Sequence, residues 1–182
     1  TTALINVAPT ATTTYTVTGT TNGCTAVGTV TVTVNPLPTV TVTPAAPAIC
    51  LGGTATLTAN GAASYVWSTG ATTAAINVTP LVTTTYTVTG TSAAGCTSVA
   101  TVTVTVNTPP VVDLGADKTI TIGDNVTLTP VVTGGSGSFS YVWTPGGQTT
   151  ASINVSPTAT TLYSVLVTDL GTGCTATDNV TV

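Results

Sequence analysis

The feature that most limits what this chain can fold into is an internal repeat. The segment TTALINVAPTATTTYTVTGTTNGCTAVGTVTVTVN at 1–35 recurs at 72–107 as TTAAINVTPLVTTTYTVTGTSAAGCTSVATVTVTVN, and more loosely at 149–182. The period of about 71 to 78 residues is longer than the roughly 20 to 50 residues of solenoid repeats, and it suits a tandem array of small domains. The sequence therefore predicts the back half of a repeat at 1–35, a complete repeat at 36–107 and another complete repeat at 108–182.

The half repeat at 1–35 cannot bury its apolar face by itself. It supplies only about three strands, so apolar side chains such as Val17 and Val30 lack an opposing sheet against which to bury. We expect residues upstream of Thr1 to complete this domain, in preference to strands donated by another chain. The repeat at 108–182 has no spare front half to donate.

Strict alternation of valine and threonine predicts half-buried strands. In TVTVTVN at 101–107, the period of two puts valine on one face and threonine on the other. Turn residues separate further segments of this kind within the repeat at 36–107, namely 39–42, 54–59, 64–68, 74–78, 84–90 and 98–104. These signals predict an all-β fold of tandem immunoglobulin-like β-sandwich domains in a head-to-tail array.

The large aromatic side chains are predicted to fill the core of each sandwich. They recur at matching places, with tryptophan in the third strand and tyrosine at the start of the penultimate strand: Trp67, Trp143, Tyr15, Tyr86 and Tyr163. Each small repeat has few other large side chains for its interior, which favours core packing. The alternative is a platform for stacking sugar rings, built from Tyr65 with Trp67 or from Tyr141 with Trp143.

Charged side chains are rare, and this excludes several classes of function. The chain has one Lys+Arg, five Asp+Glu and no His, with a net charge of −4. A single lysine cannot displace the counterions of nucleic-acid phosphates, and only aspartates are available for acid–base catalysis, so we expect neither a nucleic-acid partner nor an enzyme. No cofactor is implied. No stretch approaches the roughly 18 consecutive apolar residues that membrane insertion by a helix requires.

All charged residues follow residue 112. Three of the aspartates are expected in the first strands of the repeat at 108–182 and one in its late hairpin. Their spacing fits no EF-hand loop, so we expect solvated surface charges and no metal site. The charged residues are Asp113, Asp117, Lys118, Asp124, Asp169 and Asp178.

Several segments resemble a known kind of repeat. WSTGATT at 67–73, TTTYTVTG at 83–90 and GCTSVATVTVTVN at 95–107 are similar to the tandem Ig-like or PKD-like repeats of secreted Bacteroidota surface proteins, including giant adhesins. VVDLGADKTITIGDNVTL at 111–128 resembles a second variant of those repeats. The resemblance covers essentially the whole chain and implies an extracellular, repetitive β-sandwich stalk or filament. It implies no particular ligand.

The cysteines give the sharpest structural expectation. In the repeat pattern, the early Cys50 and the late Cys96 lie at opposite ends of a sandwich. A strand of about six residues is ~20 Å long, whereas a disulfide needs Cα atoms within about 7 Å. The repeat at 108–182 has Thr121 at the early position, so Cys174 has no partner there. In a head-to-tail array this predicts a Cys50–Cys174 bond between domains, with an intra-repeat Cys50–Cys96 bond and free thiols as alternatives.

The same rule assigns partners to the remaining cysteines. Cys24 and Cys96 would bond to cysteines that precede residue 1. Without a CxxC pair or a histidine, zinc binding is not expected, and disulfides favour an oxidising, extracellular setting.

The sequence therefore predicts an extracellular structural or adhesive protein, a segment of a repetitive bacterial cell-surface filament or adhesin stalk. The alternative is a carbohydrate- or surface-binding module that uses loops such as TGGSGSFS at 133–140. Because little charge repels neighbouring chains, we expect lateral association with other copies or neighbouring repeats. Glycans and surfaces are further candidate partners.

Overall fold

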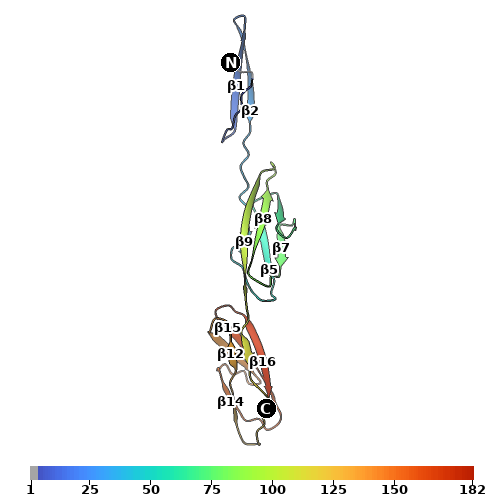
Figure 1. The fold of residues 1–182 in the computed structure, drawn as a ribbon, viewed down its shortest axis with the longest axis vertical. Helices are drawn as coiled ribbons and strands as arrows, with labels where there is room; N and C mark the ends of the chain where they lie inside the picture. Colours follow the sequence, from blue (N-terminus) through green and yellow to red (C-terminus); the bar gives the residue numbers. More distant parts are fainter. Residues whose placement is uncertain (1–3) are drawn as a thin grey trace. The chain divides into compact units, whose positions relative to one another are not determined.

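The computed structural model describes residues 4–182 of the chain, and the regular elements in this range are the strands β1 to β16 (Figure 1). Among these residues no helix is long and apolar enough to cross a membrane. The fold is all-β, as the alternation of valine and threonine predicts, with Ig-like sandwiches in residues 41–107 and 111–181 and a two-stranded hairpin before them. The chain divides into two compact units, one of Thr1–Val42, Ala59–Ala74 and Thr87–Ala100, the other of Thr43–Thr58, Ala75–Tyr86 and Thr101–Val182.

The first pair of strands is an antiparallel hairpin of β1 (Thr13–Thr21) and β2 (Cys24–Val32). Asn22 and Gly23 join the strands with positive φ angles of 50° and 82°, as a two-residue turn of paired strands requires. The prediction of a third strand here is wrong, because the apolar segment at 5–7 forms none. In the later repeats the matching segment forms a strand by pairing with one that lies earlier in the chain.

Residues 41–107 form two sheets with the strand orders β3-β5-β7 and β4-β9-β8-β6. Strands β5 and β7 pair antiparallel, as do β6 and β8, whereas β4 and β9 pair parallel. The strands are β3 (Thr41–Thr43), β4 (Ala48–Cys50), β5 (Ala55–Asn60), β6 (Ser64–Trp67), β7 (Ala75–Val78), β8 (Thr84–Thr91) and β9 (Thr97–Asn107). Each predicted segment overlaps a strand. The sequence does not predict β4, because proline and glycine flank its three residues and give them the pattern of a loop.

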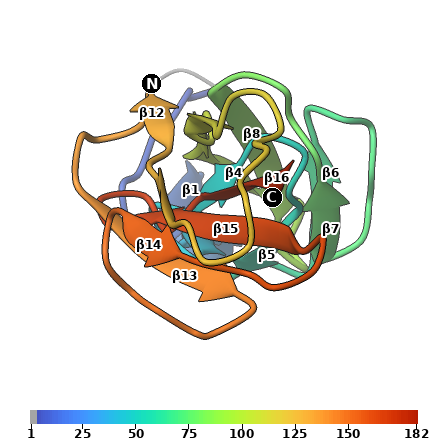
Figure 2. The ribbon, with the colours of Figure 1, turned by 90° about the horizontal axis from the view of Figure 1, so that it is seen from below.

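Residues 111–181 form the sheets β13-β15-β16, β11-β14 and β10-β12, and β13 lies beside β15 (Figure 2). The paired strands are antiparallel. The strands are β10 (Val111–Asp113), β11 (Val126–Leu128), β12 (Val131–Thr133), β13 (Phe139–Thr144), β14 (Ile153–Val155), β15 (Leu162–Asp169) and β16 (Thr175–Thr181).

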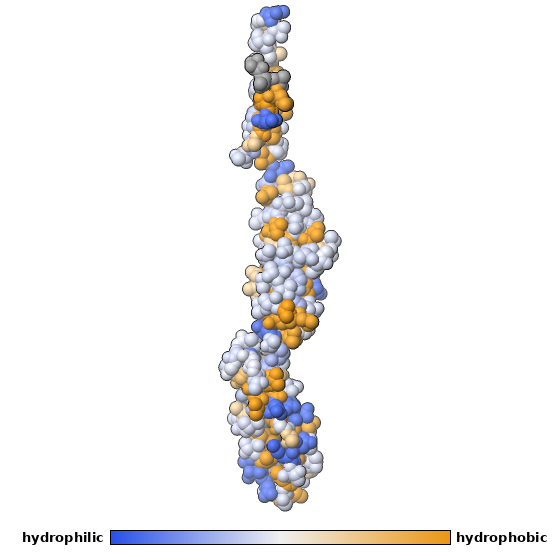
Figure 3. Space-filling model, in the orientation of Figure 1, coloured by the Kyte–Doolittle hydropathy of each residue, from blue (hydrophilic) through white to orange (hydrophobic). Residues whose placement is uncertain are grey.

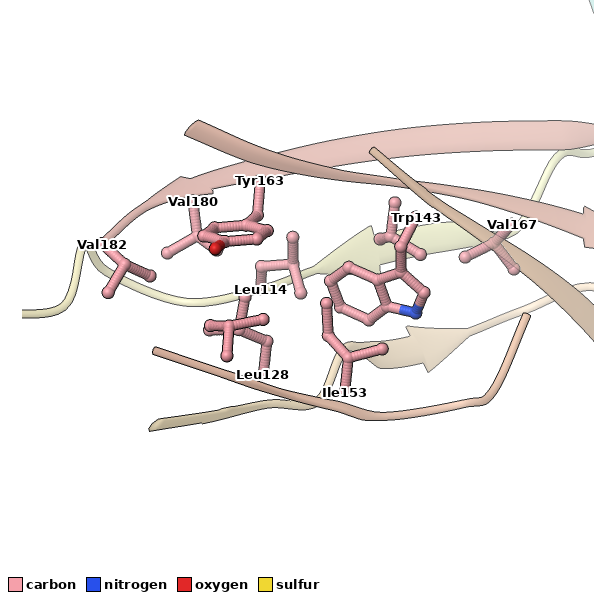
Figure 4. Close-up of a cluster of buried hydrophobic side chains, with 10 residues drawn as sticks. Leu114, Leu128, Trp143, Ile153, Tyr163, Val167, Val180 and Val182 are labelled. Atoms are coloured by element: carbon pink, nitrogen blue, oxygen red, sulfur yellow. The ribbon is translucent and has the colours of Figure 1, made fainter. Parts of the chain in front are cut away.

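The core of this last part lies between the β13-β15-β16 sheet and the β11-β14 sheet (Figure 4). Trp143 from β13 and Val165 and Val167 from β15 are fully buried, and they share one cluster with Leu128 and Ile153 from the other sheet. Every second residue of β15 points inward, as the period of two requires. Burying one valine or leucine side chain stabilises the fold by about 1.5–3 kcal/mol, so this cluster is the main source of stability here.

Candidate functional site

The structure contains a disulfide between Cys50 and Cys174, two residues 124 positions apart in the sequence, with 5.6 Å between their Cα atoms. This is the pairing that the sequence favours. The alternative Cys50–Cys96 bond does not form, and Cys96 is a free thiol, as is Cys24. Cys174 is fully buried, so solvent does not reach its side chain.

Cys50 lies at the end of β4, and a ladder of hydrogen bonds fixes it. In the parallel pairing of β4 with β9, Cys50 is opposite Asn107. The Leu51 N–H donates to the Asn107 carbonyl at 2.8 Å, and the Thr105 N–H donates to the Pro47 carbonyl at 2.9 Å. Cys50 therefore belongs to the sheet, as the last residue of β4.

Cys174 is held by the tight turn between β15 and β16. The Asp169 N–H donates to the Cys174 carbonyl at 2.8 Å, and the Gly173 N–H donates to the Asp169 carbonyl at 2.7 Å. Gly173 has a φ of 74°, a conformation that glycine adopts without strain. The sulfur of Cys174 lies 4.0 Å from the carbonyl oxygen of Asn107, the residue opposite Cys50.

The carboxylate of Asp169 fixes the same turn to the loop at 134–138. It is fully buried and accepts hydrogen bonds from the Ser136 hydroxyl, from the Ser136 N–H at 2.8 Å and from the Gly171 N–H at 2.9 Å. The Ser136 hydroxyl is the largest cause that lowers the pKa of Asp169 from 3.8 to about 2. Burial raises this pKa, whereas the N–H groups of Gly171 and Ser136 and the Thr172 hydroxyl lower it further. The expectation that Asp169 is solvated is wrong, because these donors replace water around its charge.

Glycine makes this close packing possible. A Cβ atom on Gly135 would lie 2.7 Å from Oδ2 of Asp169, and one on Gly171 would lie 2.6 Å from Cβ of Ser136. Both distances are shorter than atoms tolerate, so a larger residue at either position would displace the carboxylate or the loop. The glycines of TGGSGSFS are the sequence signal that could have revealed a buried acceptor here.

The other aspartates cap loops with backbone hydrogen bonds. Asp178 accepts from the Leu114 N–H at 2.7 Å, Asp117 from the Thr181 N–H at 2.8 Å, and Asp113 from the Gly115 N–H at 2.7 Å. Asp113 ends β10, but Asp117 and Asp124 lie outside the strands, where the sequence predicts them inside. Among residues 4–182 no three potential metal ligands come together.

The aromatic residues are placed as core and not as a platform. Trp67 is 2% exposed and Trp143 is fully buried, so neither indole face is open to a sugar ring. The hydroxyl of Tyr65 donates to the Ala62 carbonyl at 3.1 Å, and Tyr141 is half-buried. Among the tyrosines predicted for the core, Tyr163 is buried, whereas Tyr15 and Tyr86 are half-buried.

The free thiol of Cys96 occupies a position like that of Cys174. Its turn is closed by a hydrogen bond from the Ser92 N–H to the Cys96 carbonyl at 2.8 Å, and the Cys96 N–H donates to the Ser92 hydroxyl at 3.1 Å. The sulfur of Cys96 lies 3.8 Å from the carbonyl oxygen of Asn35. In the repeat alignment Asn35 corresponds to Asn107, so the two late cysteines lie beside corresponding residues, although Cys96 is half-buried and free whereas Cys174 is fully buried and bonded.

No protein-family model matches this chain, and no curated protein matches it either. Similar solved structures include a Ca2+-stabilized adhesin that helps an Antarctic bacterium bind ice, at 18% identity and a TM-score of 0.42, covering 92% of this chain and 55% of that chain. Another is the insect immune protein hemolin, at 13% identity and a TM-score of 0.35, covering 92% of this chain and 54% of that chain. A third is the N-terminal Ig1-2 module of the Drosophila receptor protein tyrosine phosphatase DLAR, at 12% identity and a TM-score of 0.33, covering 78% of this chain and 96% of that chain.

Proposed function

We propose that this chain is part of an extracellular structural or adhesive protein, a stretch of a repetitive surface filament or adhesin stalk. Its role in this proposal is mechanical continuity and involves no catalysis. The observation that carries the proposal is the Cys50–Cys174 disulfide, which joins the proposed repeat at 36–107 to the proposed repeat at 108–182. The resemblance of both repeats to those of secreted bacterial surface proteins supports the same assignment.

The disulfide supplements a short covalent link. The backbone connects the two proposed repeats through NTPP at 107–110, and a proline-rich linker is semi-rigid at best. A second covalent connection through Cys50 and Cys174 restricts the motion that this linker leaves free. Such a bond persists in an oxidising environment, which supports a location outside the cell.

The outer faces of the strands suit a surface of this kind. Threonine hydroxyls pair across neighbouring strands, between Thr14 and Thr31 and between Thr85 and Thr103, at 2.8 Å in both cases. These contacts carry no charge, so neither salt nor pH acts on them directly. Because little charge repels neighbouring chains, this surface favours association with other copies of the chain.

Two measurements test the proposal. When the full chain is pulled from its ends, the oxidised form should reach a fully extended length about 40 nm shorter than the Cys50→Ser/Cys174→Ser form, because the bond shields 124 residues of about 3.3–3.6 Å each. Equal extended lengths of the two forms would contradict the mechanical role of the disulfide. Antibodies should also label the native protein on intact cells, and labelling only after permeabilisation would contradict an extracellular location.

A further inference from the structure

We propose that the β1–β2 hairpin, together with Cys96, forms a docking site for the front half of a repeat of this same type. The occupant is a polypeptide segment with the sequence pattern of residues 36–71, carrying a cysteine at the position of Cys50. Docking would complete a sandwich on the hairpin and form a disulfide with Cys96. This site goes beyond the mechanical role proposed above and rests on the geometry of the repeats alone.

The first observation is an uncovered apolar face on the hairpin. Tyr15 is opposite Val30 in the register of β1 and β2, just as Tyr163 is opposite Val180 in β15 and β16. Val180 is fully buried, whereas Val30 is 61% exposed. The difference arises because the other sheet of residues 111–182 covers Val180, whereas no described sheet covers Val30.

The same contrast holds one step along the first strand. Val17 on β1 is 69% exposed, but the matching Val88 on β8 and Val165 on β15 are both fully buried. Apolar surface is visible on the hairpin (Figure 3). Val17 and Val30 line a groove of about 390 Å³ together with Ile5. The hairpin therefore has the inner face of a sandwich without the opposing layer.

The second observation is the apolar segment at 5–7, which reads INV and forms no strand. The same letters form β7 and β14 in the later repeats, where Ile76 is opposite Leu57 and Ile153 is opposite Leu128. Ile5 instead is 65% exposed. What this segment lacks is a strand like β5 or β11, and such strands come from the front half of a repeat.

The third observation is the position of Cys96. At the formed disulfide, Cys50 is opposite Asn107 in the parallel strand pair, and the sulfur of Cys174 lies 4.0 Å from the Asn107 carbonyl. The sulfur of Cys96 lies 3.8 Å from the carbonyl of Asn35, the residue that corresponds to Asn107. A strand like β4, added parallel to the chain beside Asn35, would bring its own cysteine next to Cys96.

One segment supplies what all three features lack. Residues 36–71 contain the strands β3, β4, β5 and β6, and β4 ends at Cys50. They also contribute Leu57 and Trp67 to the buried core of their own repeat. Because Thr1 aligns with Thr72, a copy of residues 36–71 placed directly before Thr1 has the spacing of a complete repeat.

The experiment uses the full chain with such a copy fused before Thr1. The expected result is a disulfide between the cysteine of the copy and Cys96, identified by mass spectrometry of the peptides, while Cys24 stays a free thiol. Hydrogen exchange of the amides in β1 and β2 should slow toward the rates of β15 and β16, which serve as the internal reference for a folded chain.

Two control fusions separate docking from chemical cross-linking. A copy with Cys50→Ser should still slow exchange in β1 and β2, because apolar contacts drive the docking. A copy with Leu57→Ser and Trp67→Ser should leave exchange in the hairpin at its rate in the unfused chain. The proposal fails if the cysteine of the copy bonds to Cys24 as often as to Cys96, or if the unaltered copy leaves exchange in β1 and β2 unchanged.

Discussion

Trp143 donates its indole N–H to the carbonyl oxygen of Thr150 at 2.9 Å, seven residues further along the chain. Trp67 makes the equivalent bond to the Thr73 carbonyl at 3.0 Å. In both repeats a buried tryptophan thus fills the core and also fixes the loop that follows its own strand. The buried N–H of an indole needs such an acceptor, since leaving it unpaired would cost about 1–3 kcal/mol.

Replacing this tryptophan should show both contributions. We expect Trp143→Ala to destabilise the fold by about 3–5 kcal/mol through loss of packing in the core. Trp143→Phe should cost less, since it keeps an aromatic ring but leaves the Thr150 carbonyl without its donor. Urea unfolding measures both changes, and a Trp143→Phe variant as stable as the natural chain would contradict the role of the hydrogen bond.

Removing the disulfide should destabilise the oxidised chain. Cross-linking a long loop restricts the unfolded chain, and the bond closes 124 residues, so Cys174→Ser combined with Cys50→Ser should cost about 3–5 kcal/mol. Cys24→Ser is the matched control and should have no effect, since that thiol is exposed and free. Guanidinium unfolding with and without a reductant gives the comparison, and reduction should not alter the double variant.

Protonation of Asp169 should lower the stability of the fold in acid. Hydrogen bonds, chiefly from the Ser136 hydroxyl, lower the pKa of Asp169 from 3.8 to about 2. Because the folded state binds the proton more weakly than the unfolded state, the stabilisation is complete above pH 3.8 and is lost as the pH falls toward 2. Unfolding midpoints across this range should drop for the natural chain and stay flatter for Asp169→Asn. The same slope in Asp169→Asn as in the exposed-site control Asp124→Asn would contradict this.

Alanine substitutions at two glycines should distinguish backbone strain from steric conflict. Gly135 and Gly137 have φ angles of 66° and 85°, so alanine should be strained at either position, by about 1 kcal/mol. Only at Gly135 would the new Cβ meet the Asp169 carboxylate, at 2.7 Å, while nothing lies within 4 Å at Gly137. We expect Gly135→Ala to destabilise the fold clearly more than Gly137→Ala, as measured by thermal unfolding.

The hairpin valines should tolerate polar substitution where their repeat counterparts do not. Val17 is 69% exposed and Val165 is fully buried, although the two correspond in sequence. We expect Val17→Thr to change stability by less than about 0.5 kcal/mol. Val165→Thr should destabilise by about 1–3 kcal/mol, because it buries a hydroxyl in the core. Equal costs would mean that a layer already covers Val17.

Sequence reasoning predicts most of the strands, because alternation of valine and threonine is a local signal that pairing then obeys. It also predicts the place of Trp67 and Trp143, since few other large side chains are available to fill each core. It misses β4, whose three residues form a strand only through parallel pairing with residues of β9 that lie 57 positions further along the chain.

Non-local contacts also explain the other errors. The segment at 5–7 has the letters of a strand but no partner to pair with, so its pattern alone is not sufficient. Asp169 is buried because the Ser136 loop closes over it, and nothing in the residues next to Asp169 signals this. The disulfide can be predicted from the sequence because the repeat at 108–182 lacks an early cysteine, which leaves Cys174 without a partner in its own repeat.

The parallel pairing of β4 with β9 determines how tension would enter these strands. Cys50 and Asn107 stand side by side at the same ends of two strands that run in the same direction. A pull transmitted through the disulfide and a pull transmitted through the backbone after Asn107 would therefore act on neighbouring strands along a common axis. Because both pulls act in the same direction on strands that lie side by side, the tension would be divided between two strands instead of passing through one, and the hydrogen bonds between β4 and β9 would not be pulled apart by it.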